Sequence, residues 1–215
     1  MRTRVKICGI TRPDDAAEAA RLGVDSIGLV FHDSSPRAVD LQTARAVRAA
    51  IPPFVTVAAL FMDATAERVR EVLGAVAVDL LQFHGSESPE YCTGFGRPYI
   101  KAVPMGAGSR PEQVLGAHEQ AIGFLLDSHR VGEQGGSGVV FDWRAIPDLL
   151  GRPLILAGGL TPDNVADAVS QVRPWAVDVS SGVESAPGVK DARRMASFIN
   201  EVQRVQHERS NTAAD

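Results

Sequence analysis

The chain has 215 residues and a mass of 22.9 kDa, and its 45% hydrophobic and 22% charged residues are typical of a globular protein with a sizeable core. A formal net charge of −4 and a pI near 5.7 exclude an overall positive field that would attract nucleic acid or an anionic membrane. Two cysteines, Cys8 and Cys92, exclude a disulfide scaffold, and the sequence has neither zinc-ligand spacing nor an apolar run of about 18 residues. We therefore expect a cytoplasmic protein with no metal site, no nucleic-acid partner and no membrane span.

Eight short apolar runs, rich in β-branched residues, recur along the chain. In chain order they cover residues 4–8, 25–31, 54–61, 78–83, 98–103, 122–127, 153–158 and 176–180. Most are apolar throughout, which is typical of strands that are buried on both faces. The runs therefore predict a parallel sheet with helices packed outside it.

Segments of helical periodicity separate these runs. The clear ones cover residues 14–23, 41–51, 65–74, 111–118, 161–172 and 190–205. Two weaker segments, 88–95 and 141–151, are assigned to helices because they lie between strands, and Pro147 interrupts the second. The expected helix ends are N-caps at Asp14, Asp40, Thr65 and Thr161, and stops at Gly23 and Gly74.

The alternation of eight strands with eight helical segments predicts a single α/β domain, a (β/α)8 or TIM barrel, over residues 1–206. The polar segment 207–215 is expected to form a disordered tail. An open doubly wound sheet is the alternative. It is disfavoured because no G-x-G-x-x-G motif follows the first run.

The active site of such a barrel lies at the carboxyl ends of its strands, so the residues that end each run are candidates. Cys8 ends the first run, His84 follows the fourth and Asp127 ends the sixth. Partial burial at this rim tunes side chains for acid–base chemistry. Each residue also has a structural interpretation: a buried thiol, a packed imidazole and a turn cap.

Two neighbouring turns are candidates for phosphate binding. Gly158 and Gly159 follow the seventh run, and Ser180, Ser181 and Gly182 follow the eighth, where many barrels bind phosphate through backbone amides. The alternative is a pair of ordinary tight turns.

Two further loops are candidates for contact with a substrate. Arg37, after the second run, is either a solvated charge or a planar fork for a carboxylate. The segment 132–138, with four glycines in seven residues, is interpreted as a lid or as a plain flexible loop.

Several motifs together resemble the phosphoribosylanthranilate isomerase family over about residues 4–199. They are VKICGIT (5–11), SPR (35–37), QFHG (82–85), LLDS (125–128), FDW (141–143), LAGGLTPDNV (156–165) and VDVSSGVE (177–184). The departures are modest: Phe83 replaces the usual leucine, VV precedes FDW, and 105–113 lacks a family signature. The resemblance implies an enzyme of tryptophan biosynthesis, without a cofactor, that converts N-(5′-phosphoribosyl)anthranilate to 1-(2-carboxyphenylamino)-1-deoxyribulose 5-phosphate by an Amadori rearrangement.

The resemblance also implies roles for the candidate residues. By position, Cys8 is the general base and Asp127 the general acid; Arg37 holds the anthranilate carboxylate, Asp178 the sugar hydroxyls, and the two turns the phosphate. A histidine at a strand end can pack, bond locally or touch the substrate, and His84 is taken as a further substrate contact. A thiolate and a protonated carboxyl together reverse their ordinary pKa order of about 8.5 and 3.9. We therefore expect desolvation to raise the pKa of Asp127, and a nearby positive charge or helix terminus to lower that of Cys8.

Three other functions are considered. A related aminoaldose isomerase of histidine biosynthesis is expected to have an Asp/Asp pair and two phosphate sites. The next enzyme of the tryptophan pathway is expected to use lysine chemistry, and the only lysines here are Lys6, Lys101 and Lys190. A non-catalytic phosphosugar-binding barrel is expected to have lost Cys8 or Asp127. The expected partner is a small phosphorylated aminosugar, and the sequence does not indicate an oligomeric state.

Overall fold

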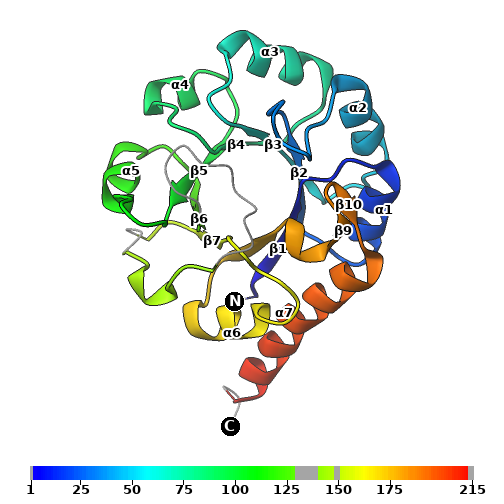
Figure 1. Cartoon of the computed structure of the whole chain (residues 1–215), viewed down its shortest axis with the longest axis vertical. Coiled ribbons are helices and arrows are strands. Elements are labelled where there is room, and N and C mark those ends of the chain that lie inside the picture. Colours follow the sequence, from blue (N-terminus) through cyan, green and yellow to red (C-terminus); the bar gives the residue numbers. More distant parts are fainter. Residues whose placement is uncertain (1, 129–139, 148–150, 213–215) are drawn as a thin grey trace.

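Eight parallel strands close into a barrel in chain order in the computed structural model, which describes residues 2–128, 140–147 and 151–212 (Figure 1). The strands are β1 (Arg4–Cys8), β2 (Ser26–Val30), β3 (Thr56–Phe61), β4 (Leu80–Phe83), β5 (Tyr99–Pro104), β6 (Gly123–Asp127), β7 (Leu154–Leu156) and β8 (Ala176–Val179). Each lies within one of the predicted runs or extends one residue beyond it. The predicted (β/α)8 barrel is confirmed.

Helices surround the barrel (Figure 1). They are α1 (Pro13–Arg21), α2 (Leu41–Ala49), α3 (Ala66–Ala75), α4 (Pro89–Thr93), α5 (Pro111–Ala117), α6 (Val165–Val172) and α7 (Ala192–Thr212). A helix is predicted for 141–151, between β6 and β7; among the described residues 141–147 of that segment, the structure has only a short 3-10 helix over Trp143–Ala145. The glycine-rich segment 132–138 and residues 148–150 lie outside the described residues.

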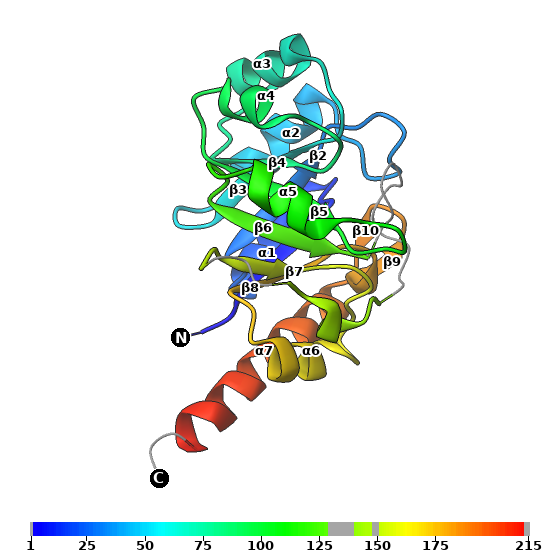
Figure 2. The same ribbon diagram turned by 90° about the vertical axis from the view of Figure 1, so that its left-hand side faces the viewer.

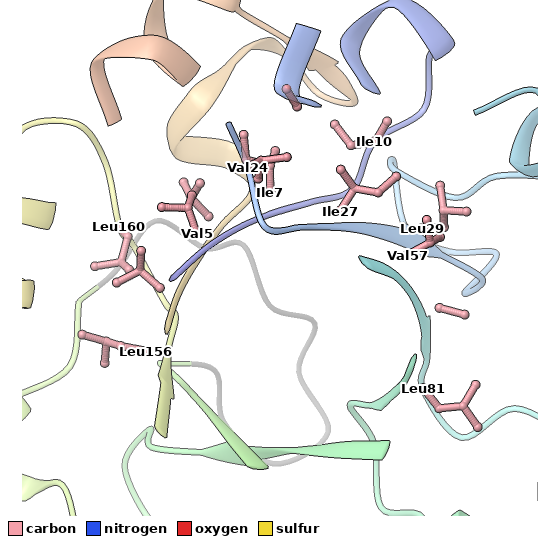
Figure 3. Packing of buried hydrophobic residues seen from close by; sticks show 14 of the residues in the cluster. Val5, Ile7, Ile10, Val24, Ile27, Leu29, Val57, Leu81, Leu156 and Leu160 are labelled. Carbon is pink, nitrogen blue, oxygen red and sulfur yellow. The ribbon is translucent and has the colours of Figure 1, made fainter. Parts of the chain in front are cut away.

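The core between barrel and helices is formed by the outward side chains of the strands and by apolar side chains of the helices. Val5, Ile7 and Ile27 point from β1 and β2 toward the surrounding helices and are at most 4% exposed (Figure 3). Because successive side chains of a strand face opposite sides, Lys6 and Cys8 of β1 face the barrel interior. One strand thus supplies both the core and the site.

The predicted N-caps are half right. The side chains of Asp40 and Thr65 accept hydrogen bonds from the third residue of α2 and α3, as expected of N-caps. Asp14 lies instead in the first turn of α1, because Pro13, whose fixed φ suits the first helical position, starts that helix earlier. Thr161 lies in a turn before α6, whose N-cap residue is Asn164.

One of the two predicted helix stops is confirmed and the other is wrong. Gly23 follows α1 with a φ of 88°, a left-handed conformation that ends a helix readily. Gly74 lies inside α3, which continues to Ala75, so the expected stop there is wrong.

The C-terminal helix is longer than expected. The helix α7 runs to Thr212, so the disordered tail predicted from residue 207 is wrong for 207–212. Arg209 donates hydrogen bonds to the carbonyls of Val169 and Ser170 in α6, at 2.7 and 2.8 Å, and these contacts anchor the segment. No helix in the described part of the chain is both long and apolar enough to cross a membrane.

A small antiparallel hairpin, β9 (Glu184–Ala186) and β10 (Val189–Lys190), follows β8 and is absent from the sequence prediction. It lies at the end of the barrel away from the N-terminus (Figure 2). Because all eight barrel strands are parallel, this is the end where their carboxyl termini meet. The hairpin therefore borders the face on which the site is expected.

A buried histidine makes stability depend on pH. Burial, followed by the charge of Lys101, lowers the pKa of His118 to about 4. The unfolded chain binds a proton near pH 6.5, so this contribution to stability is lost as the pH falls from about 6.5 toward 4. We expect the free energy of unfolding to fall between pH 7.5 and 5 by about 2 kcal/mol more in the wild type than in His118→Gln. Urea unfolding at both pH values measures this difference, and equal losses would contradict it.

Candidate active site

A cavity opens among the residues at the carboxyl ends of the strands. Six of the predicted site residues line it: Cys8, Arg37, His84, Asp127, Asp178 and Ser180. Val30, His32, Ser35, Leu60, Met62 and Gln82 complete the lining. Residues from β1, β4, β6 and β8, and from the β2–α2 loop, therefore meet around one space.

Cys8 lies beside a buried ion pair formed by the first and last barrel strands. The register of β1 against β8 pairs Lys6 with Asp178, and Lys6 Nζ lies 2.9 Å from Asp178 Oδ1. Gly28 on β2 leaves room for this arrangement, because a Cβ there would lie 2.7 Å from Cys8 Sγ and 3.1 Å from Lys6 Nζ. Cys8 Sγ and Lys6 Nζ thus both lie over the backbone of Gly28.

The environment of Cys8 contains opposing electrostatic effects. Burial raises the pKa of its thiol; Lys6 lowers it by charge and by a hydrogen bond, Asp178 raises it and Lys190 lowers it. The resulting pKa lies above the ordinary value, so the expectation of a lowered thiol pKa is wrong for the ligand-free protein. Burial outweighs the two lysines because the thiolate loses more solvation free energy in this interior than it gains from attraction to their charges.

Asp127 ends β6 and faces the imidazole of His84. His84 Nε2 lies 3.4 Å from Asp127 Oδ2, and both side chains are buried. Gln82, two residues before His84, is 3.2 Å from His84 Nδ1 through its Nε2 atom. If the amide donates to Nδ1, the imidazole carries its proton on Nε2, toward Asp127. The imidazole therefore directs its Nε2 atom at the carboxyl.

Arg37 is held by a carboxylate from the hairpin. Its Nε and Nη2 atoms donate to Glu184 Oε1 and Oε2, each at 2.8 Å, and Lys190 Nζ also donates to Glu184 Oε1 at 2.8 Å. Although burial opposes it, hydrogen bonds from Arg37 and Lys190 hold the pKa of Glu184 below its ordinary value. Gly9 permits the fork, because a Cβ there would lie 2.6 Å from Arg37 Cδ. Two cations share one carboxylate, so this cluster carries a net positive charge, and Arg37 is its member that lines the cavity.

The predicted phosphate turns lie close together. Gly159, Ser181 and Gly182 line a second cavity with Arg193 and Arg194 at the start of α7. Gly158 and Gly159 have φ values of 79° and 66°, which glycine adopts without strain.

Two of the turn glycines also have packing roles. A Cβ on Gly158 would lie 2.5 Å from the Ser128 amide nitrogen, and one on Gly182 would lie 2.0 Å from the Leu160 carbonyl oxygen. Both glycines therefore permit close approach of neighbouring loops, whatever they bind.

Several residues around the cavity are missing from the sequence prediction as site residues: Lys6, Gly28, Gln82, Glu184 and Lys190. The alternation of strand β1 was a signal for Lys6, since residues two apart share a face with Cys8. The same rule places Gln82 beside His84. Glu184 and Lys190 had no such signal, because they reach the site through a hairpin with no apolar pattern.

A closed barrel with a thiol, a carboxyl, an imidazole and an arginine around one cavity at the carboxyl ends of its strands belongs to the (β/α)8-barrel enzymes. A family model described as N-(5′-phosphoribosyl)anthranilate (PRA) isomerase matches residues 5–201. The chain belongs to this isomerase family, whose reaction is a step of tryptophan biosynthesis.

Individual relatives agree with this assignment. An N-(5′-phosphoribosyl)anthranilate isomerase from Halorhodospira halophila is 57% identical over 95% of this chain and 98% of its own. The crystal structure of phosphoribosyl anthranilate isomerase from Thermotoga maritima has a TM-score of 0.83 and 39% identity, over 94% of this chain and 98% of that one. A phosphoribosyl anthranilate isomerase in complex with reduced 1-(o-carboxyphenylamino)-1-deoxyribulose 5-phosphate has a TM-score of 0.79 and 36% identity, with the same coverage.

Proposed function

We propose that this cavity carries out the Amadori rearrangement of N-(5′-phosphoribosyl)anthranilate with Cys8 as general base and Asp127 as general acid. The observation that supports these roles is that the thiol at the end of β1 and the carboxyl at the end of β6 line the same cavity. In the closed ring, β8 and β7 separate β1 from β6, so the two groups approach a bound sugar from different sides.

The reaction begins with ring opening. Asp127 donates its proton to the furanose ring oxygen, and the anthranilate nitrogen forms an iminium as the C1′–O bond breaks. The iminium acidifies the C2′ hydrogen, which the Cys8 thiolate removes to give an enolamine. Return of the thiol proton to C1′, and loss of the 2′-hydroxyl proton to the carboxylate, give the ketone and restore both groups.

The neighbours of the acid and the base support their roles. His84 contacts the substrate beside Asp127, and its hydrogen bond with Gln82 fixes the ring that faces the carboxyl. Asp178 Oδ1 accepts a hydrogen bond from Lys6, and the carboxylate contacts the sugar hydroxyls of the substrate. The backbone amides of 158–159 and 180–182 hold the phosphate, for which a neutral nest suffices in a chain of net charge −4.

Arg37 is proposed to bind the anthranilate carboxylate. Glu184 occupies its Nε and Nη2 atoms, and Nη1 makes no hydrogen bond with the described residues, so Nη1 is the donor offered to the cavity. We expect Arg37→Ala to raise KM about 10- to 100-fold with a much smaller change in kcat, because a charge-assisted hydrogen bond is lost from ground and transition states alike. Steady-state kinetics beside Arg97→Ala, an exposed arginine, measures this effect. A fall in kcat at unchanged KM would refute the assignment.

A fluorescence assay tests the proposed function. Freshly generated N-(5′-phosphoribosyl)anthranilate is mixed with the enzyme, and the loss of anthranilate-type emission is followed for the wild type, Cys8→Ala and Asp127→Asn. Turnover by the wild type that disappears in both variants supports the reaction and the pair together. A flat trace from folded wild type and verified substrate would refute the proposal, and the aminoaldose of histidine biosynthesis would be the next substrate tested.

A further inference from the structure

We propose that Lys6 is a positioning residue of this active site, whose ammonium, held by Asp178, stabilises the thiolate form of Cys8. The inference rests on the proposed function, in which Cys8 is the base, and adds a residue to it. It assigns a task to a buried lysine that contacts no proposed reacting atom of the substrate.

Strand geometry and close packing carry the inference. Lys6 and Cys8 lie two residues apart on β1 and face the barrel interior, where Lys6 is 5% and Cys8 6% exposed. Gly28 of β2 has no side chain, and both atoms lie close to the place that its Cβ would take. A Cβ there would be 2.7 Å from Cys8 Sγ and 3.1 Å from Lys6 Nζ. The buried ammonium therefore lies near the sulfur as well as 2.9 Å from the Asp178 carboxylate.

Asp178 explains why the lysine stays charged. Although burial opposes the charge, the Asp178 carboxylate and the Cys8 sulfur hold the pKa of Lys6 above its ordinary value. The Asp178 carboxylate accepts a hydrogen bond from Lys6 Nζ through Oδ1, at 2.9 Å. A structural ion pair needs only these two residues, whereas this pair also lies against a titratable thiol.

Other charged groups also face Cys8. Lys190 of β10 favours its thiolate, and Asp178 of β8 opposes it. Arg37 of the β2–α2 loop also interacts electrostatically with the thiol. His84 and Asp127 line the same cavity from β4 and β6. Among the described groups, Lys6 is the cation with both a charge and a hydrogen-bond effect on the sulfur, so its removal has a larger expected effect than that of Lys190.

The test is a titration of the thiolate by its ultraviolet absorbance in the enzyme without substrate. Cys8→Ala supplies the background, because Cys92 is buried with a pKa raised to about 12 and titrates separately. We expect Lys6→Met to raise the titration midpoint of Cys8 by about one pH unit or more, which means at least tenfold less thiolate at a fixed pH.

A second comparison keeps the test valid if the buried Asp178 carboxylate, left alone, prevents Lys6→Met from folding. Asp178→Asn is compared with Lys6→Met/Asp178→Asn, in which the pair is neutral, and the loss of Lys6 is again expected to raise the midpoint. Lys101→Met is the control, because this buried lysine pairs with Glu87 and is not among the charged groups that act on the Cys8 thiol. An unchanged or lowered midpoint on loss of Lys6 would overturn the inference.

The proposed function can fail separately. If Cys8→Ala retains turnover, Cys8 is not the base, whatever the titration gives. If Cys8→Ala is inactive and the midpoint does not depend on Lys6, the base stands and Lys6 is only a structural partner of Asp178.

Discussion

Cys8→Ala is expected to lower kcat about 10²- to 10⁴-fold while KM changes little. A positioned base contributes about that factor, and the variant removes it without touching the groups that hold the carboxylate and the phosphate. Cys8→Ser is expected to be nearly as inactive, because a hydroxyl in the same place is a far weaker base. Steady-state kinetics on all three proteins measures the effect.

Cys92→Ala is the matched control for this variant. Cys92 is a free buried cysteine in α4, away from the cavity, so its loss reduces stability and leaves kcat close to that of the wild type. A pH profile adds a further check. Because the proposed active form carries a protonated Asp127 together with the Cys8 thiolate, kcat/KM of the wild type is expected to have a bell-shaped dependence on pH, and the raised pKa of the Cys8 thiol moves the alkaline limb to higher pH. Near-normal turnover by Cys8→Ala would remove Cys8 from the mechanism.

Asp127→Asn is expected to lower kcat by a similar factor, about 10²- to 10⁴-fold. The amide matches the shape of the carboxyl and still faces His84, but it cannot release an acidic proton to the ring oxygen. Ring opening then lacks its acid. Single-turnover kinetics with excess enzyme isolates this chemical step from product release.

The control for Asp127→Asn is Asp33→Asn, which neutralises an exposed carboxylate in the β2–α2 loop and is expected to leave kcat unchanged. Asp127→Glu is the informative partner. A displaced carboxyl that restores part of the lost activity supports proton donation, whereas equal activity of Asp127→Asn and the wild type would exclude it.

The barrel was predictable because its strands are short, apolar and regularly spaced. A strand buried on both faces leaves a continuous apolar run, so the runs at 25–31 and 122–127 locate β2 and β6 with little ambiguity. The ends of helices were less predictable, since Thr161 and Gly74 have suitable side chains and backbone freedom but lie where tertiary contacts, not local preference, decide the boundary. The end of α7 is similar: Arg209 docks on α6, a contact between residues 40 apart in sequence.

The site was predictable where a residue ends a strand and unpredictable where a partner arrives from elsewhere. Cys8 and Asp127 end their strands, Asp178 lies one residue before the end of β8, and all three line one cavity. Glu184 reaches Arg37 across 147 residues of sequence, through a hairpin of five strand residues. The direction of the Cys8 pKa shift required the balance between burial and two lysines, which no sequence pattern contains.

The contact between Lys6 and Asp178 joins the first and last strands of the barrel, 172 residues apart in sequence. Forming such a contact carries a loop-closure cost that most contacts within neighbouring β/α units do not bear. A chain in which β8 has not yet paired with β1 lacks the Asp178 partner of Lys6 and the turn after β8. If Cys8 and that turn have the proposed roles, we expect turnover to recover during refolding only when the ring closes, whereas recovered helix content reports only the formation of the helices.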